Sequence, residues 1–317
     1  MERRRPAALP VSTVRELAAE TGLSIATISR VLNGHANVAP HTRDLVLRAA
    51  GRQPRAGSVH VHCPYPLDEY FGPMVSSIVD TLELHGLTTV LGGRPGRSGI
   101  DGGILILPPE SAADLSRLRD QGFPFVVLDP RTPPPPDIAA VSAAHLTGAR
   151  ALMTHLVQHG HRRVGIIAGP REWLVTDARM AGYAAALAEV GVLPAPDLLR
   201  FIEPTVQLGY RAAAELLDHP ARPTALACFN DKIAVGALRA ARERGLRVPA
   251  DLSIAGFDDA EISRATDPML TTVRQPLAEL GRMAVTLLLR MINLHDLDAR
   301  HVELATDLII RDSTGPA

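Results

Sequence analysis

The stretch Ala225–Asp259, ALACFNDKIAVGALRAARERGLRVPADLSIAGFDD, decides the fold class of this chain. Apolar runs at 225–229 and 252–257 have the length of buried strands, and the segment 231–244 between them has the length and composition of a helix. A strand, a helix and a second strand in this order predict a parallel pair with the helix packed on one face.

The same alternation extends in both directions from this stretch. Further strands are expected at 59–63, 88–91, 103–107, 125–128, 164–168 and 198–201, and further helices at 71–85, 111–120, 144–159, 177–190, 207–218 and 277–292. Because so many strands would overfill one sheet, the sequence predicts an α/β body of two doubly wound parallel-sheet lobes. Open sheets of this kind bind ligands at the carboxyl ends of their strands, so the cleft between the lobes is the expected small-molecule site.

Composition sets the broad class of protein. The chain has 317 residues, of which 46% are hydrophobic and 21% charged, as in ordinary soluble globular proteins. No apolar run reaches membrane-spanning length, and the N-terminus lacks the apolar core of a signal peptide. Cys63 and Cys228 are too few for a disulfide framework or a four-sulfur zinc site. We therefore expect a cytoplasmic protein with no membrane partner.

Charge is distributed unevenly along the chain. Residues 1–57 hold nine arginines against four acidic residues, a net charge of +5, which leaves −6 for the rest because the whole chain carries −1. A basic head on a larger acidic body is typical of a segment that meets a polyanion.

Helix signals are dense in this head. Thr13 and Glu16 have the spacing of a capping box at the start of a first helix, and Gly22 favours its end. Ser24 is expected to cap a second helix that runs from Ile25 to about 32. A third helix is expected to begin at residue 40 and to pack Leu45, Val46 and Ala49 inward. Three short helices with a tight turn between the first two indicate a helix-turn-helix.

The second helix of such a motif enters the DNA major groove with its N-terminus first. The residues nearest the DNA are then Ser24, Ile25, Ala26, Thr27, Ser29 and Arg30. An isoleucine at this helix start lies off the inward stripe, which favours contact with a thymine methyl group. The alternative is a small helical protein-interaction module with a solvated basic face.

Residues 14–50, and SIATISRVLNG at 24–34 above all, resemble the DNA-binding head of the LacI/GalR family of bacterial transcription regulators. The resemblance implies operator reading by Ile25, Ala26 and Arg30. It implies phosphate contacts by Thr13, Ser24, Thr27, Ser29, Asn33 and Thr42. Ala39 departs from the family, which has Ser or Thr there to cap the third helix.

Four motifs extend the resemblance across the body: HLVQHGHRRVGIIAGP (155–170), ARMAGYAAALAEVGV (178–192), residues 229–263, and PMLTTVRQPLAELGRMAVTLLL (268–289). They are similar to the sensor domain of LacI/GalR regulators, which shares the fold of periplasmic sugar-binding proteins. The resemblance places effector contacts at Arg179, Asn230 and Asp258 in one lobe, and at Tyr70 and Phe71, with Asp68 beside them, in the other.

The sequence also leaves open a purely structural role for Arg179, Asn230 and Asp258. Asn230 or Asp231 can cap the helix at 231–244, and Asp258 or Asp259 can cap a short helix that follows the strand. Arg179 can be a solvated arginine.

Two departures from the family bear on switching. The usual hinge helix with its ARxL motif is missing, since no leucine occurs between Leu47 and Leu67. The usual Asp-Asn pair before the crossover helix is replaced by Ala144 and His145. Without the minor-groove leucine wedge, we expect little bending of the operator centre and looser coupling between effector and DNA.

Signals for other chemistry are weak. His155 and His159 lie four residues apart on an expected helix, but no Glu lies between them, so solvated or helix-end histidines are favoured over a metal site. The run HVHC at 60–63 resembles metal-ligand spacing, but alternate residues of a strand share a face, so Cys63 would lie with Val61 on the face opposite to His60 and His62. No nucleotide-binding glycine motif, nucleophile elbow or carboxylate pair suggests a cofactor or an enzyme.

The sequence thus predicts a ligand-responsive transcription regulator, most readily a repressor, that acts as a homodimer on double-stranded operator DNA and is nucleoid-associated. Residues 1–50 form the expected head, 51–58 a short linker in place of the hinge, and 59–317 the effector-binding and dimerisation domain. The expected effector is a sugar or a related metabolite. The alternative is a small-molecule sensor whose head, without the hinge, binds DNA weakly.

Overall fold

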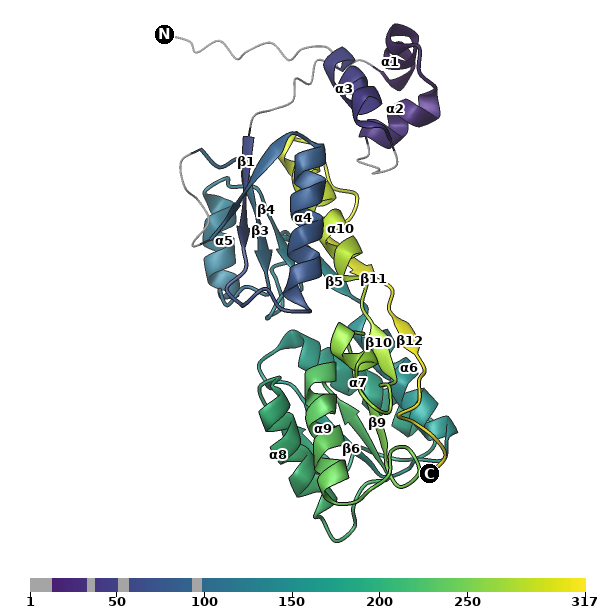
Figure 1. The fold of residues 1–317 in the computed structure, drawn as a ribbon. Helices are drawn as coiled ribbons and strands as arrows, with labels where there is room; N and C mark the ends of the chain where they lie inside the picture. Colours follow the sequence, from purple (N-terminus) through teal and green to yellow (C-terminus); the bar gives the residue numbers. More distant parts are fainter. Residues whose placement is uncertain (1–12, 33–37, 51–56, 93–98) are drawn as a thin grey trace.

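The computed structural model describes residues 13–32, 38–50, 57–92 and 99–317 (Figure 1). The head holds three helices, α1 (Val14–Thr21), α2 (Ile25–Leu32) and α3 (Pro40–Ala49). Leu17, Ile28 and Val31 pack with Val46 in a small buried core. The helix-turn-helix expected from the sequence is therefore present.

Local hydrogen bonds fix the helix ends of the head. The Thr13 hydroxyl accepts from the Glu16 N–H at 3.3 Å, and the Glu16 carboxylate accepts from the Thr13 N–H at 2.7 Å, which confirms the capping box. Gly22 takes the left-handed conformation with φ 69°, as expected of a helix-ending glycine. The Ser24 hydroxyl accepts from the Thr27 N–H at 3.1 Å, so it caps α2.

One core assignment in the head is wrong. Leu45 is 39% exposed, whereas Val46 is fully buried. Consecutive helical residues point about 100° apart, so only one of the two can face the small core.

The N-lobe is a six-stranded parallel sheet in the order β11-β5-β4-β3-β1-β2. Its strands are β1 (Gly57–His62), β2 (Leu87–Leu91), β3 (Gly102–Ile106), β4 (Phe125–Leu128), β5 (Ala139–Ala143) and β11 (His301–Leu304). Ile104 and Ile106 of β3 belong to the core under α4 (Phe71–Leu84) and α10 (Leu277–Ile292), whereas Leu105 faces α5 (Ala112–Asp120) on the other side. The sheet is thus buried on both faces, as parallel sheets require.

The C-lobe is a four-stranded parallel sheet in the order β7-β6-β8-β9. Its strands are β6 (Val164–Ala168), β7 (Leu199–Phe201), β8 (Ala225–Cys228) and β9 (Ser253–Ala255). Its α-helices are α6 (His145–Gln158), α7 (Leu174–Ala188), α8 (Val206–Leu217) and α9 (Asp231–Glu243). Short 3-10 helices lie at Pro196–Leu198 and Glu261–Arg264. Helices α6 and α7 pair on one face, and α8 and α9 pair on the other (Figure 1). The two lobes confirm the fold class expected from the sequence.

Three segments cross between the lobes, namely 143–145, 274–277 and 304–307. Beside them lies an antiparallel pair, β10 (Thr272–Arg274) with β12 (Asp307–Ile309). The sequence failed to indicate β5, β10, β11 and β12. These strands are short and rich in alanine or polar residues, so they lack the apolar run by which strands are found.

Candidate functional site

The surface predicted to contact DNA lies at the start of α2. Ile25 is 54% exposed, and Ala26 and Arg30 are exposed with it. The hydroxyl groups of Ser24 and Thr27 are hydrogen-bonded at 2.8 Å. Thr27 and Ser29 are half-buried. Thr42 is half-buried on α3, and Asn33 lies outside the described residues. The structure therefore brings the predicted base-reading side chains Ile25, Ala26 and Arg30 together on one accessible surface.

A cavity of about 350 Å³ lies between the two lobes. It is built at the carboxyl ends of strands from both sheets, as expected for open α/β folds. Leu107, Asp129 and Asp258 follow β3, β4 and β9, and all three have positive φ values, of 44°, 52° and 111°. Such backbone strain in residues other than glycine is concentrated at functional sites.

All five side chains expected at an effector site, Tyr70, Phe71, Arg179, Asn230 and Asp258, line this cavity. Tyr70 and Phe71 come from the start of α4 in the N-lobe, and the other three come from the C-lobe. The two groups lie more than a hundred residues apart in the sequence. They meet only because the two lobes face each other across the cavity.

A continuous polar chain crosses the floor of the cavity. The Tyr70 hydroxyl donates to Asp129, and His145 Nε2 lies 2.9 Å from the other Asp129 oxygen. On its other side, His145 Nδ1 is 3.4 Å from an Arg179 nitrogen, and Arg179 lies 3.8 Å from Asp258. Because a guanidinium only donates, Nδ1 of His145 accepts and its proton sits on Nε2, which donates to Asp129.

Arg179 is buried, and its guanidinium makes several contacts within and beside this chain. Its guanidinium stacks on Phe257 at 3.6 Å and on Phe229 at 4.4 Å from the ring centres, and it also donates to the Phe229 carbonyl. The solvated interpretation of Arg179 is therefore wrong. Its Nε atom is buried and has no hydrogen-bond partner among the described residues.

The two carboxyl groups of the chain differ in acidity. Burial alone favours the neutral form of Asp129, but the electrostatic interaction and hydrogen bond with His145 and the hydrogen bond from Tyr70 hold its pKa below the ordinary value. At Asp258 burial dominates over Arg179 and the 2.7 Å hydrogen bond from Gln275, and raises the pKa to about 7. The polar chain therefore holds one carboxyl group that is ionised at neutral pH, Asp129, and one with a pKa near neutral pH, Asp258.

An ion pair joins the lobes at one side of the cavity. Lys232, the only lysine of the chain, donates to the Asp68 carboxylate across the gap. The other Asp68 oxygen accepts from the N–H groups of Tyr70 at 3.0 Å and Phe71 at 3.1 Å. Asp68 thus accepts hydrogen bonds from backbone N–H groups at the start of α4 and links this helix to Lys232 of α9.

Aromatic rings form the apolar walls. Tyr65 stacks on Phe71 with 5.0 Å between ring centres, and Trp173 meets Phe229 edge-on at 6.1 Å. Rings of this kind pack against the C–H faces of sugars and of other ring compounds.

Asn230 has the capping role that the sequence left open, since its side-chain oxygen accepts from the Ile233 N–H at 3.1 Å. It lines the cavity at the same time. Asp258 and Asp259, by contrast, do not cap the short helix. The N–H of Ala260, the residue before that short helix, donates to Asp231 at 2.8 Å.

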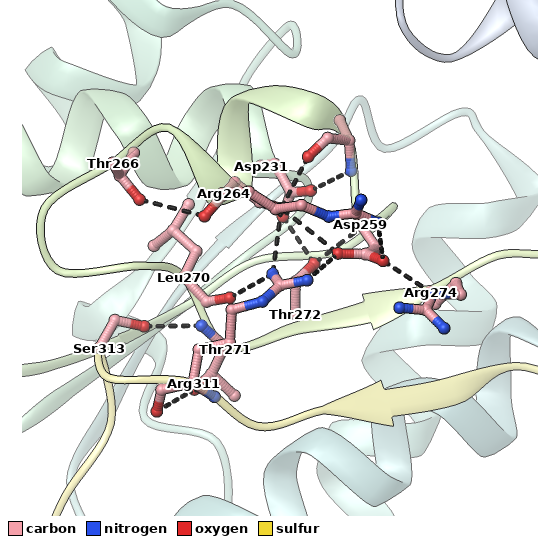
Figure 2. A network of polar contacts seen from close by, with 12 residues as sticks. Asp231, Asp259, Arg264, Thr266, Leu270, Thr271, Thr272, Arg274, Arg311 and Ser313 are labelled. Carbon is pink, nitrogen blue, oxygen red and sulfur yellow. Dashed lines mark hydrogen bonds and ion pairs between the residues drawn. The ribbon is translucent and has the colours of Figure 1, made fainter.

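Asp259 points away from the cavity into a cluster of arginines. Figure 2 shows Arg264, Arg274 and Arg311 converging on its carboxylate, whose side chain is 1% exposed. Burial opposes the charge, but hydrogen bonds from the three arginines lower the pKa of Asp259 to about 2. This cluster ties the loop that carries Asp258 to β10 and to the C-terminal segment.

Two further expectations concern histidines. His155 and His161 are buried, so the solvated interpretation does not apply to His155. They bond to the C-terminal segment, His155 to Thr314 at 2.9 Å and His161 to Gly315 at 3.0 Å. Within the described ranges, no three His, Cys, Asp or Glu side chains are placed to hold a metal ion.

The sequence missed Asp129, His145, Trp173, Phe229 and Lys232 as cavity or chain residues. A signal existed for Asp129, which directly follows a buried strand end. His145 was noted only as a departure from the family, because its partners come from distant strands.

The fold and the site together define a two-lobed ligand-binding protein that carries a helix-turn-helix head. Residues 13–52 match the model of the bacterial regulatory proteins of the lacI family, and residues 153–314 match that of a periplasmic binding protein-like domain. The HTH-type transcriptional repressor CytR of Escherichia coli (strain K12) is 32% identical over 328 residues, covering 96% of each chain. The chain belongs to the LacI family and is a DNA-binding transcription regulator.

Solved structures agree with this assignment. The transcriptional regulator CelR–cellobiose complex superposes with a TM-score of 0.75 at 28% identity, covering 95% of this chain and 99% of the other. A LacI family regulator from Enterococcus faecium with bound ribose gives a TM-score of 0.72 at 28% identity, over 82% and 99% of the two chains. In the part of the chain that the structure describes, every helix is too short or too polar to cross a membrane.

Proposed function

We propose that this regulator is a repressor that binds a pseudo-palindromic operator as a homodimer, and that a sugar-like molecule between its lobes sets its operator affinity. The observation that carries the proposal is the polar chain in the cavity, since Tyr70 and Asp129 belong to one lobe and Arg179 and Asp258 to the other. A ligand bound there touches both lobes, so its binding energy depends on their arrangement. The cellobiose and ribose complexes of the relatives support a sugar.

In this proposal the effector contacts are Tyr70, Phe71, Arg179, Asn230 and Asp258. Asp258 and Asn230 exchange hydrogen bonds with hydroxyl groups, while Phe71 packs against the ring. The cavity binds its ligand without turning it over, in keeping with relatives that are regulators.

The proposed DNA contacts divide by role. Ile25, Ala26 and Arg30 read bases, because they are exposed at the start of α2. Phosphates are bound by Thr13, Ser24, Thr27, Ser29, Asn33 and Thr42. Two heads about 34 Å apart then read two half-sites in the cytoplasm, where the operator DNA lies.

The proposed domain division keeps residues 1–50 as the head and the remainder as linker and sensor. Strand β1 begins at Gly57, so the last two residues of the expected linker, 57 and 58, are strand residues. The expected loss of the hinge helix falls mainly on residues 51–56, which lie outside the described residues.

Selection of bound sequences from random duplex DNA by the full-length protein, repeated with ribose, cellobiose and nucleosides, tests the proposal. A palindromic sequence should be enriched, its affinity should fall steeply with salt, and one class of ligand should change it. Arg30→Ala should weaken operator binding about tenfold or more, whereas Arg242→Ala, an exposed arginine of α9, should not. Enrichment of no sequence, or equal effects of the two variants, contradicts the proposal.

A further inference from the structure

The charges that line the cavity are strongly unbalanced. Among the described residues that form its wall, six are acidic and two are cationic, the acids being Asp68, Glu69, Asp129, Glu203, Asp231 and Asp258 and the cations Arg179 and Lys232. Burial raises the pKa of both Asp231 and Asp258, so these two contribute least negative charge. Four carboxylates still face two cations at neutral pH.

Both cations are already paired. Lys232 is bonded to Asp68, and Arg179 lies against Asp258 and donates to a backbone carbonyl. The stacking of Arg179 between Phe257 and Phe229 fixes its guanidinium in this position. An incoming anion thus meets no free positive charge in the described wall, and it meets Glu69 and Glu203 exposed at the rim.

The remaining features of the wall suit a neutral, hydroxyl-rich ring. An ionised carboxylate only accepts hydrogen bonds, so the carboxylates of the wall favour a ligand that offers donors such as sugar hydroxyls. The aromatic rings of the wall cover the apolar faces of such a ring.

Building on the proposed function, we infer that the cavity selects uncharged polyhydroxylated ring compounds and rejects their phosphorylated and carboxylated forms. At an effective dielectric constant of about 20, one uncompensated carboxylate about 6 Å from an anion weakens its binding about 100-fold. Specificity therefore lies in the excess of carboxylates and in the prior pairing of Arg179 and Lys232.

Matched ligand pairs test the inference directly. Ribose with ribose 5-phosphate, cellobiose with cellobionate, and adenosine with its 5′-monophosphate are titrated calorimetrically into the full-length protein. The neutral member of any pair that binds should bind about 100-fold more tightly than the anionic one. An anionic member that binds as tightly as its neutral partner, or more tightly, overturns the inference.

A variant of the interlobe ion pair makes the test independent of folding. Asp68→Asn keeps the oxygen that accepts from the Tyr70 and Phe71 N–H groups but frees Lys232 from its pair. The affinity ratio of neutral to anionic ligand should fall about tenfold or more. Glu215→Gln breaks an exposed pair with Arg200 on the far side of the lobe and should leave the ratio unchanged. A ratio that is unchanged in Asp68→Asn contradicts the charge mechanism.

The inference and the proposed function fail in different ways. A neutral ligand that binds selectively but leaves operator affinity unchanged refutes the proposed function alone. An anionic compound that alters operator affinity more than its neutral partner refutes the inference alone. If no neutral compound of a broad metabolite panel binds, both are refuted.

Discussion

Replacing Asp259 by asparagine should destabilise the C-lobe by removing one charge from the arginine cluster of Figure 2. Asparagine keeps the size of the side chain and one acceptor oxygen, and it tolerates the left-handed backbone of this position, with φ 53°. The substitution therefore isolates the charge. Arg264 and Arg274 are about half exposed, so water can solvate them, but the Arg311 side chain is only 11% exposed and loses its counter-charge.

Two arguments give the expected loss in the free energy of unfolding. Removing one partner of a buried ion pair costs about 3–5 kcal/mol, and we expect the lower end because a single arginine stays buried. The fall in the pKa of Asp259 from 3.8 to about 2 independently corresponds to about 2 kcal/mol of stabilisation. Since this pKa is depressed on folding, the contribution is complete above about pH 5 and disappears as the pH falls towards 2. We therefore expect a loss of about 2–3 kcal/mol at pH 7.

Urea unfolding followed by circular dichroism, at pH 7 and at intervals down to pH 3, measures this loss. Asp218→Asn is the matched control, because Asp218 also pairs with an arginine, Arg244, but its side chain is 64% exposed. The control should cost less than about 1 kcal/mol. Equal losses in the two variants, or a loss in Asp259→Asn that does not shrink at low pH, would refute the reasoning.

Three further predictions concern the cavity, the helix packing and the head. Affinity for a neutral effector, measured by calorimetry, should rise about tenfold from pH 6 to pH 8. Burial raises the pKa of Asp258 to about 7, and only the ionised carboxylate can accept hydrogen bonds from ligand hydroxyls through both of its oxygens. The Asp258→Asn variant should show no such rise. Gly182→Ala should cost about 3 kcal/mol in urea unfolding, since its Cβ would lie 2.3 Å from the Leu146 carbonyl oxygen of α6, whereas Gly72→Ala, with its nearest atom at 3.9 Å, should change stability by less than about 0.5 kcal/mol. Thr13→Ala should reduce protection of the α1 amides in hydrogen exchange by about 1 kcal/mol, and Thr13→Ser should retain it.

The candidate site was predictable where a residue follows a buried strand within a recognisable motif. Asn230 and Asp258 follow β8 and β9 within such motifs, and Asp129 obeys the same strand-end rule although it was missed. Arg179 lies within α7, so only its motif placed it at the cavity. His145 and Trp173 carried no such signal. His145 acquires its role only because Asp129 and Arg179 approach it from opposite sides.

The sequence by itself determined the three helices of the head, the order of most strands and helices in the body, and the existence of two parallel sheets. These features arise from apolar periodicity, helix caps and turn residues, which act over a few neighbouring positions. The tertiary structure alone decided the polar chain from Tyr70 to Asp258, the Asp68–Lys232 pair and the four missed strands. Such features depend on hydrogen bonds and charges between residues far apart in the chain, and their local sequence does not determine which partners the packed lobes will bring within reach.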